Sequence, residues 1–233
     1  MELVAEYSAV QRIAKDTMNY IKKQISPGMR LKEIRKICEN RMLQLGADSF
    51  WYYNVGAFVF SGTDTVLSLS GRKYKTADIV IKPDDIITID LSPQCNKVWG
   101  DYARTLIMQN GNIADKIEHI KNEEWRKGLL MEKMLHKKIK EFASPLTTFE
   151  ELFFFMNTFI SENGYVNLDF SGNLGHSIEK NKNDRIYIEK GNKTRLGDAA
   201  FFTFEPHIKR ENGMYGYKKE NIYCFKGNYL CEI

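Results

Sequence analysis

The sequence lacks the features that direct a chain to a membrane, to nucleic acid or into a secretory route. None of its 233 residues belongs to an apolar run near the ~20 residues that a membrane span needs. The N-terminal segment is polar and amphipathic, which is not the pattern of a signal peptide. The net charge is only +4, with basic and acidic residues interspersed, so we expect no nucleic-acid partner and no membrane partner.

Cysteine is also scarce. The chain has four, Cys38, Cys95, Cys224 and Cys231, and no pair of them has Cys-x-x-Cys spacing. We therefore expect buried free thiols, which favour a reducing cytosol and a cytoplasmic protein.

The chain does have abundant apolar material for a core. Apolar residues make up 43% and aromatic residues 12%, in a length that suffices for one large domain or two small ones. Residues 50–62 are especially aromatic. We expect most of these rings in the core, with some lining an apolar pocket.

Hydrophobic periodicity predicts three early helices, over residues 3–25, 30–45 and 123–142. The third turns an apolar face inward and its lysines outward. We expect His119 and His136 to lie in surface patterns and to ligate nothing. The polar residues 110–122 between helix and strand patterns are expected to form a loop.

An internal repeat with an offset of 118 positions predicts two similar α/β halves, about residues 1–110 and 111–233. The second copy adds a capping box at Thr148 and Glu151. Chance similarity between two amphipathic helices is the alternative explanation. The matching residues are Ser26, Pro27, Leu31, Glu33, Ile34 and Gly46, and then Ser144, Pro145, Phe149, Glu151, Leu152 and Gly164.

Asp90 and Asp101 form the centre of the first half. Asp90 ends a run of β-branched residues, and Asp101 opens a second strand pattern after a turn over residues 92–99. An antiparallel hairpin would place the two carboxylates close together, where they repel and are costly to desolvate. A divalent cation makes such a pair favourable, because hard cations bind oxygen ligands. The alternative is two aspartates solvated at a hairpin end.

The second half carries a similar arrangement. One apolar strand ends in Glu205, Glu220 opens a returning strand, and His176 follows a glycine in the segment before them. Together with the two aspartates, these groups are four carboxylates and one imidazole, a set that suits two divalent ions with some carboxylates bridging.

The order and context of these residues resemble the pita-bread metallopeptidase family, which includes methionine aminopeptidases, Xaa-Pro aminopeptidases, prolidases and creatinase. The motifs are Ile-Asp-Leu at Asp90, Gly-Asp-Tyr-Ala-Arg-Thr at Asp101, Gly-His at His176, Thr-Phe-Glu-Pro at Glu205 and the acid at Glu220. The resemblance implies an α+β pita-bread fold with two pseudo-symmetric α/β halves around a central antiparallel sheet. It spans residues 1–233, which we expect to form a single catalytic domain.

The same resemblance implies roles for the five residues. His176 and Glu205 would hold one metal ion and Asp90 the other, with Asp101 and Glu220 bridging. Glu205 would also be catalytic, taking a proton from the attacking water and passing it to the leaving amine. Oxygen-rich ligation favours two manganese ions, with cobalt, iron or zinc left open.

Two histidines of the family are missing. The one that precedes the first metal strand is replaced by Leu69, or in another alignment by Ser68, and the one seven positions after His176 is replaced by Asn183. Each such hydrogen-bond donor is worth roughly 10²–10³ in rate. His207, on the same strand face as Glu205, is a candidate catalytic donor in their place; a partly exposed histidine is the plain alternative.

Lys218 provides a clue to the subfamily. It stands where Xaa-Pro peptidases carry the arginine of Gly-x-Arg-x-Glu, and lysine is a weaker, non-bidentate substitute. We expect Leu69 and Lys218 to be substrate-binding positions. We expect a bare catalytic domain without the additional N-terminal domain that most prolidases carry, as in the simplest methionine aminopeptidases.

The function expected from this resemblance is a dinuclear-metal aminopeptidase or dipeptidase that hydrolyses an N-terminal peptide bond. The Xaa-Pro type is favoured and the methionine aminopeptidase type comes next. A non-peptidase hydrolase or lyase acting on a small amide or amine is one alternative, and a binding module with a relic site is another. The partner is a peptide or small amide substrate, and a homodimer is left open.

Overall fold

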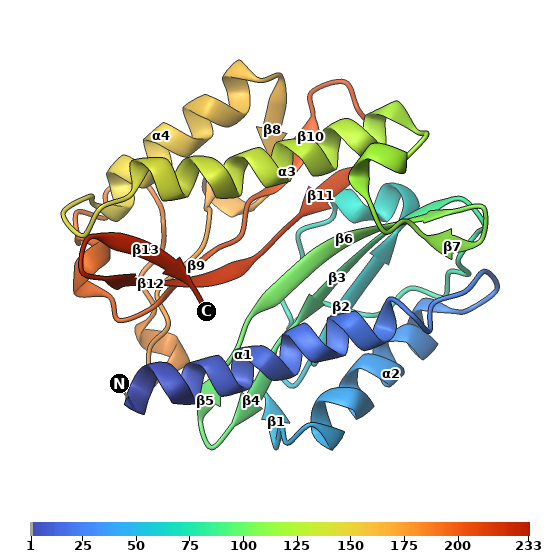
Figure 1. The fold of residues 1–233 in the computed structure, drawn as a ribbon, viewed down its shortest axis with the longest axis horizontal. Helices are drawn as coiled ribbons and strands as arrows, with labels where there is room; N and C mark the ends of the chain where they lie inside the picture. Colours follow the sequence, from blue (N-terminus) through green and yellow to red (C-terminus); the bar gives the residue numbers. More distant parts are fainter. Residues whose placement is uncertain (1) are drawn as a thin grey trace.

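The computed structural model describes residues 2–233, with helices along two opposite sides and the strands between them (Figure 1). In the first half, α1 (Glu2–Ile21) and α2 (Leu31–Gln44) pack on a sheet of strand order β2-β3-β6-β7. In the second half, α3 (Glu123–Phe142) and α4 (Phe149–Glu162) pack on strands of the sheets β13-β12-β9 and β11-β10-β8. This mixture of helices and antiparallel sheets confirms the predicted α+β class.

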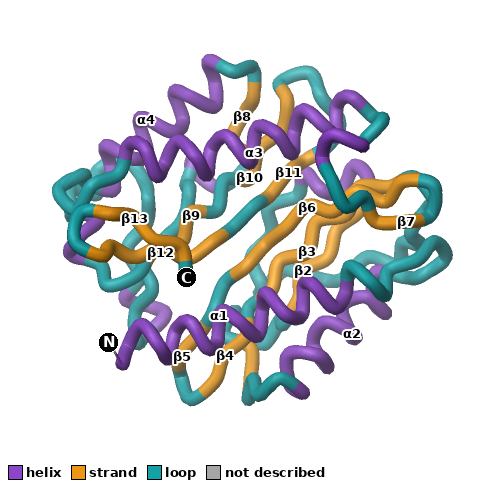
Figure 2. The backbone as a smooth tube through the Cα atoms, viewed as in Figure 1, coloured by secondary structure: helices purple, strands orange, loops and turns teal. Residues whose placement is uncertain are grey.

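The strands are short, and every paired neighbour is antiparallel (Figure 2). The first half contains β1 (Ser49–Phe50), β2 (Ala57–Ser61), β3 (Asp85–Leu91), β4 (Pro93–Cys95), β5 (Val98–Trp99), β6 (Tyr102–Gln109) and β7 (Asn112–Ile113), with the 3₁₀ helices Gly62–Val66 and Ile117–His119. The second half contains β8 (Tyr165–Asn167), β9 (Phe202–Phe204), β10 (His207–Arg210), β11 (Gly216–Lys218), β12 (Asn221–Lys226) and β13 (Tyr229–Glu232), with the 3₁₀ helices Phe170–Gly172, Lys182–Asp184 and Leu196–Asp198.

The central strand β3 is buried on both faces, which explains its almost uninterrupted apolar sequence. It pairs with β2 on one side and with β6 on the other, where Asp90 lies opposite Ala103. The β-branched side chains of Ile86, Ile87 and Ile89 fill the space between strand and helices. Asp90 is thereby held near the end of a rigid strand.

Helices α2 and α4 show the same burial pattern at an offset of 118 positions. Each is 14 residues long, and each buries four residues at helical spacing against its sheet. The pairs are Leu31 and Phe149, Ile34 and Leu152, Cys38 and Met156, and Met42 and Ile160.

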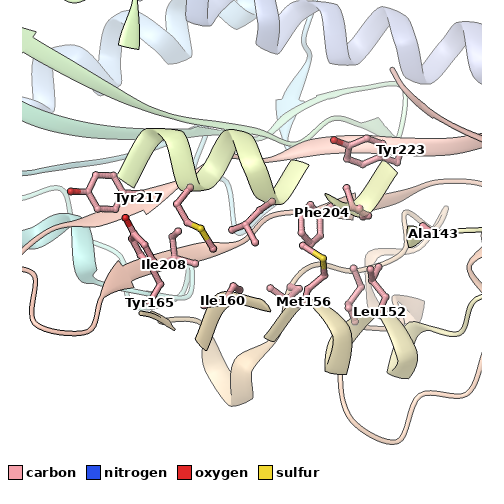
Figure 3. Close-up of a cluster of buried hydrophobic side chains, with 14 of the residues drawn as sticks. Ala143, Leu152, Met156, Ile160, Tyr165, Phe204, Ile208, Tyr217 and Tyr223 are labelled. Atoms are coloured by element: carbon pink, nitrogen blue, oxygen red, sulfur yellow. The ribbon is translucent and has the colours of Figure 1, made fainter. Parts of the chain in front are cut away.

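The second-half core is a continuous apolar cluster between α3, α4 and the strands (Figure 3). Met156 and Ile160 of α4 face Phe204 and Ile208 from the strands, and all four are almost fully buried. Burial of each such side chain stabilises the fold by about 1.5–3 kcal/mol. This packing fixes β9, which ends one residue before Glu205.

The two halves meet where β6 runs beside the chain from β11 to β12. The backbone N–H of Glu220 donates to the carbonyl of Ala103 at 3.0 Å, and the backbone N–H of Lys218 donates to Thr105 Oγ1 at 2.8 Å. These bonds bring residues more than a hundred positions apart to one seam.

Two local predictions need correction. Residues 92–99 are not a simple turn, because β4 and β5 form a small hairpin that adds β1 to its edge, with positive φ at Asn96 and Lys97. Residues 110–122 contain β7 and a 3₁₀ helix besides loop, since β7 extends the sheet next to β6.

The placement of His136 in a surface pattern was wrong. The ring is only 4% exposed, bonded to Tyr223 Oη at 2.8 Å and to the Lys219 carbonyl at 2.9 Å. Helix α3 contacts both α4 and strands of two sheets, so it buries a wider face than its apolar stripe predicts.

The cysteines partly follow expectation. All four are free within residues 2–233, but only Cys38 and Cys224 are buried, and the other two are half-buried. In the same part of the chain, no helix is sufficiently long and apolar to span a membrane.

Candidate functional site

Asp90 and Asp101 are positioned by the β3–β6 ladder. Asp90 lies one residue before the end of β3, and Asp101 lies immediately before β6. Gln11 of α1 fixes the backbone of Asp101 from both sides: its Nε2 donates to the Asp101 carbonyl at 2.7 Å, and its Oε1 accepts from the Asp101 N–H at 3.0 Å. The predicted hairpin is therefore present, and its base is tied to the first helix.

Glu205 and Glu220 are brought together by β9 and β12. These strands pair so that Phe204 lies opposite Asn221, and the two glutamates flank that pair. The seam between the halves then places Glu220 beside the aspartates. One carboxylate oxygen from each of Asp90, Asp101 and Glu220 lies within 4.8 Å of the others, a group that could hold a metal ion.

His176 completes the group with its Nε2 atom. That nitrogen lies 3.7 Å from Asp101 Oδ2 and 3.6 Å from Glu205 Oε1, while Nδ1 donates to the Ser177 carbonyl at 2.9 Å. Burial, followed by the charge of Arg185, lowers the pKa of His176 to about 3. A neutral ring with Nδ1 protonated leaves the Nε2 lone pair directed into the site, which is the form that binds a metal.

Lys218 lies among the same carboxylates. Its Nζ is 2.7 Å from Asp90 Oδ2, 3.0 Å from Glu205 Oε2 and 3.7 Å from Glu220 Oε2. Burial alone would lower the pKa of Lys218, but these three carboxylates hold it well above its ordinary value. The predicted substrate-binding residue therefore contacts the ligand cluster itself.

The electrostatics of the cluster call for more positive charge than Lys218 supplies. Burial first, and neighbouring carboxylates second, raise the pKa values of Asp101 and Glu220 well above their ordinary range. Both oxygens of the fully buried Glu220 also lack a hydrogen-bond partner anywhere in residues 2–233. Because a buried carboxylate without hydrogen bonds is strongly unfavourable, even with Lys218 Nζ 3.7 Å away, the donor set fits a bound cation.

A pocket of about 700 Å³ opens onto this cluster. One wall is aromatic, with Trp51, Tyr52, Phe58 and Phe60, so part of the aromatic stretch serves core and pocket together. Leu69 lines the opening and is 38% exposed. A site of this size and lining suits a small organic molecule or a short peptide end.

His207 lines the pocket beside Glu205, but it is not free to move. The ring is 5% exposed, so the alternative of a partly exposed histidine was wrong. Its Nε2 bonds the Thr65 carbonyl at 2.7 Å, and burial lowers its pKa to about 4. Donation from Nε2 to a substrate would require this bond to break.

Sequence reasoning missed Arg185. Asn183, at the position of the absent family histidine, is exposed, whereas Arg185 turns into the pocket. Its Nη1 is 3.4 Å from His176 Nε2, and its guanidinium lies 4.8 Å from the centre of the Trp51 ring. No periodic signal marks Arg185, because it lies in an irregular segment whose path depends on the whole fold.

The sequence matches the model of metallopeptidase family M24 over residues 5–226. The chain belongs to this family. Over 125 residues it is 34% identical to methionine aminopeptidase 1 of Bacillus subtilis, an alignment that covers 51% of this chain and 47% of that protein. The matched region of this M24 chain therefore covers about half the length of that relative.

Two solved structures share the fold. The X-Pro aminopeptidase of Thermotoga maritima aligns with a TM-score of 0.79 at 21% identity, covering 98% of this chain and 60% of that one. The prolidase of Pyrococcus furiosus aligns with a TM-score of 0.80 at 22% identity, covering 99% and 63%. This M24 chain thus has the pita-bread fold, as predicted, and matches about three fifths of these longer proteins.

Proposed function

We propose that this M24 protein is a divalent-metal-dependent aminopeptidase or dipeptidase that hydrolyses an N-terminal peptide bond. The observation that supports this most strongly is the convergence of five potential ligands in one cluster: Asp90, Asp101, His176 and Glu205, which line one pocket, and Glu220, which lies buried beside the two aspartates. Two of these residues come from the first half and three from the second, so the fold itself assembles the group. Residues 1–233 would act as one catalytic domain.

The residues suit two divalent ions. His176 and Glu205 would hold one and Asp90 the other, with Asp101 and Glu220 between them, and Mn²⁺ is the favoured metal because oxygen ligands predominate. When bound, the ions would polarise the scissile carbonyl and lower the pKa of the attacking water.

Glu205 is the proposed general base. Burial raises the pKa of its carboxyl, which brings it closer to neutral pH and improves both uptake and return of a proton. Its Oε1 lies 3.3 Å from Thr203 Oγ1, which holds the carboxylate toward the pocket. Glu205 would take the proton of the water and deliver it to the leaving amine.

Arg185 is the proposed donor to the substrate. It projects into the pocket from the loop that follows His176, and its fixed charge suits a carbonyl oxygen or a carboxylate. Trp51 supports the guanidinium from the side. We therefore assign to Arg185 the role of the histidine that Asn183 replaces, and to Leu69 an apolar contact at the pocket opening.

The Xaa-Pro type is the favoured specificity, because Lys218 stands two residues before Glu220, as the arginine of Xaa-Pro peptidases does. The methionine aminopeptidase type comes next. A panel of Xaa-Pro and Met-Xaa peptides, assayed with Mn²⁺ and with Co²⁺, tests the assignment. Turnover of a member of the panel is expected, and a complete lack of turnover with metal demonstrably bound would contradict peptidase function.

The metal assignment has its own test. Asp101→Asn and Glu220→Gln should each reduce bound metal and lower kcat/KM by more than about 100-fold. Metal content of protein purified without chelator is measured by elemental analysis. Gln109→Ala, in the same strand as Thr105 and remote from the cluster, is the matched control and should retain both metal and activity.

A second candidate function is favoured by one observation. Lys218 places an ammonium inside the carboxylate cluster, where it competes with a metal ion for Asp90 and Glu205. A non-peptidase hydrolase or lyase, or a binding module, would tolerate such competition. Lys218→Met should tighten Mn²⁺ binding in calorimetry if the competition is real. A bound metal in the unmodified protein with no peptide turnover would favour this candidate.

A further inference from the structure

Glu220 is held in place through its backbone, because its side chain makes no hydrogen bond. The residue is fully buried, and neither carboxylate oxygen has a hydrogen-bond partner in residues 2–233. Lys218 Nζ lies 3.7 Å from Oε2, which is within ion-pair distance but too long for a hydrogen bond. The direction of this carboxylate therefore depends on how the two peptide groups on either side of its Cα are fixed.

The first of these peptide groups joins Lys219 to Glu220, and it is bonded on both edges. Its N–H donates to the Ala103 carbonyl of β6 at 3.0 Å. Its carbonyl accepts from His136 Nε2 of α3 at 2.9 Å. Because a peptide group is planar, two bonds on opposite edges fix it between a strand of the first half and a helix of the second.

The His136 ring is itself held in the orientation that this bond needs. It is almost fully buried, and Nδ1 lies 2.8 Å from Tyr223 Oη. A carbonyl only accepts hydrogen bonds, so the proton is on Nε2, and Nδ1 accepts from the Tyr223 hydroxyl. Burial lowers the pKa of His136 well below its ordinary value, which keeps the ring in this neutral form.

The second peptide group joins Glu220 to Asn221, and Arg104 binds it. Nη1 donates to the Glu220 carbonyl and to the Ala103 carbonyl, each at 2.7 Å. Nη2 donates to Asn221 Oδ1 at 2.6 Å, and the guanidinium carbon lies 3.7 Å from the centre of the Tyr102 ring. The planar fork of arginine donors thus joins the two halves across this seam.

We propose that His136 and Arg104 are positioning residues for Glu220, which hold its carboxylate where the proposed metal ions need it. The proposal rests on the proposed metal-dependent function and adds two residues that do not line the pocket. Gln11 of α1 likewise holds both backbone polar groups of Asp101. Both carboxylates assigned as bridging ligands are then positioned through their backbone, each with the help of a buried side chain from a covering helix.

His136→Met tests the proposal through metal affinity. It removes the donor to the Lys219 carbonyl and should weaken Mn²⁺ binding by about tenfold or more in calorimetry, as loss of an outer-shell partner usually does. Ile139→Ala, on the same buried face of α3, is the matched control. It should lower stability at least as much but leave Mn²⁺ affinity within about twofold of the unmodified protein, because it creates a cavity without removing a bond to this backbone. His136→Gln keeps an N–H donor and should recover most of the affinity.

Arg104→Met separates positioning from charge. Removal of a nearby positive charge alone would tighten Mn²⁺ binding, whereas loss of positioning should weaken it by about tenfold. Arg12→Met, at an exposed arginine, is the matched control and should leave the affinity unchanged. Tighter binding by Arg104→Met would overturn the role of Arg104.

Amide hydrogen exchange tests the positioning of Glu220 in the metal-free protein. The ratio of exchange in residues 218–221 to exchange in β3 should be larger in His136→Met than in Ile139→Ala, because only the first variant frees this backbone locally. Mass spectrometry of overlapping peptides measures both regions. Equal ratios in the two variants would overturn the role of His136, and so would equal Mn²⁺ affinities.

The positioning proposal and the proposed function fail in different ways. If the unmodified protein binds Mn²⁺ and cleaves peptides, while His136→Met behaves like Ile139→Ala in affinity and exchange, the positioning role is removed and the proposed function is kept. An unmodified protein that binds no Mn²⁺ would overturn both, and this outcome is recognised before any variant is compared.

Discussion

In the first half, helix α1 buries Ala14 and Met18 completely; 118 positions later, helix α3 buries Glu132 and His136 almost as deeply. Ile21 and Ile139 match, both being fully buried, whereas Thr17 and Leu135 reverse the contrast, since there the buried polar residue lies in α1. The two helices therefore bury equivalent positions, but with residues that differ in polarity.

The difference shows which half carries the unusual chemistry. The first half contributes two aspartates, one of them held by the buried Gln11, whereas the second contributes His176, Glu205, Glu220, Lys218 and Arg185. His136 uses its polarity to connect α3 to Tyr223 and to the Lys219 carbonyl next to Glu220. Within residues 2–233, Glu132 has no side-chain hydrogen-bond partner, and the charge and backbone N–H of Lys219 favour its ionised form.

The contrast between α1 and α3 is tested most severely by placing a glutamate in α1, at the position equivalent to Glu132. Ala14→Glu would bury a carboxyl among the apolar side chains of the first-half core, and we expect it to lower the free energy of unfolding by about 3–5 kcal/mol. Glu132→Ala should change it by less than about 1 kcal/mol, because the loss of packing is offset by removal of a carboxyl whose charged form is disfavoured by burial. Urea unfolding measures both.

Ala14→Met separates volume from charge in this experiment. It inserts a side chain of similar length without a carboxyl, so it should cost clearly less than Ala14→Glu. Equal costs for the two variants would mean that space, and not polarity, distinguishes the halves.

The burial pattern that α2 and α4 share predicts that equivalent substitutions in them lower the free energy of unfolding by similar amounts. Ile34 in α2 and Leu152 in α4 are equivalent and fully buried, and each change to alanine should cost about 2–5 kcal/mol. We expect the two values to agree within about 1 kcal/mol, from urea unfolding with unchanged m-values. A difference of several kcal/mol would show that one half is much more tightly packed and would limit the equivalence to backbone geometry.

His136 should make the second half sensitive to acid. Burial lowers the pKa of His136 well below its ordinary value, while the unfolded chain protonates this ring below about pH 6.5. The unfolded state then binds more protons, so stability falls as the pH drops from about 6.5 toward the folded pKa and levels off below it. His176 and His207, with pKa values of about 3 and about 4, act in the same direction.

His136→Met, which installs the residue found at position 18, isolates the contribution of His136. At pH 7.5 it should cost about 1–3 kcal/mol, because Tyr223 and the Lys219 carbonyl lose a partner. Between pH 6.5 and 5 the loss of stability should become shallower by about 1.4 kcal/mol per pH unit. His119→Gln, at an exposed histidine, is the matched control for the loss of a histidine side chain. An unchanged slope in His136→Met would mean that the ring titrates normally in the folded protein.

Features that depend on local sequence patterns could be predicted, and features that depend on contacts between distant parts of the chain could not. The β3–β6 hairpin and the helices were predictable because their signals are local: runs of β-branched residues, helical spacing and caps. The proximity of Asp90 to Asp101 followed from the hairpin alone. The approach of Glu220 to these aspartates did not, because it depends on the seam between halves, and only the resemblance to a family suggested it.

The inward turn of Arg185, the burial of His136 and the position of Lys218 could not be predicted from local patterns. Each depends on what packs against the residue from another part of the chain. Arg185 lies in the irregular loop between His176 and β9, where no periodicity constrains the side chain. The assignment of the five residues as metal ligands remains a prediction.

The smallest difference between the halves lies at the start of α2 and α4. Thr148 caps α4, because its Oγ1 accepts from the Glu151 N–H at 3.1 Å while Glu151 accepts from the Thr148 N–H at 2.7 Å. At the start of α2, Glu33 accepts from the Arg30 N–H at 2.7 Å, but an arginine side chain cannot accept a bond in return. The second half thus has a complete capping box and the first has half of one.

Alanine at these two positions should reveal that asymmetry. Thr148→Ala should lower stability by about 1 kcal/mol, the usual cost of losing an N-cap acceptor. Arg30→Ala removes only the exposed ion pair with Asp78 and should cost less than about 0.5 kcal/mol. Thr148→Ser keeps the acceptor and should recover most of the loss in thermal unfolding. If Arg30→Ala proved as costly as Thr148→Ala, the start of α2 would have to be held by the arginine side chain itself, and the two helix starts would be equivalent in strength although not in chemistry.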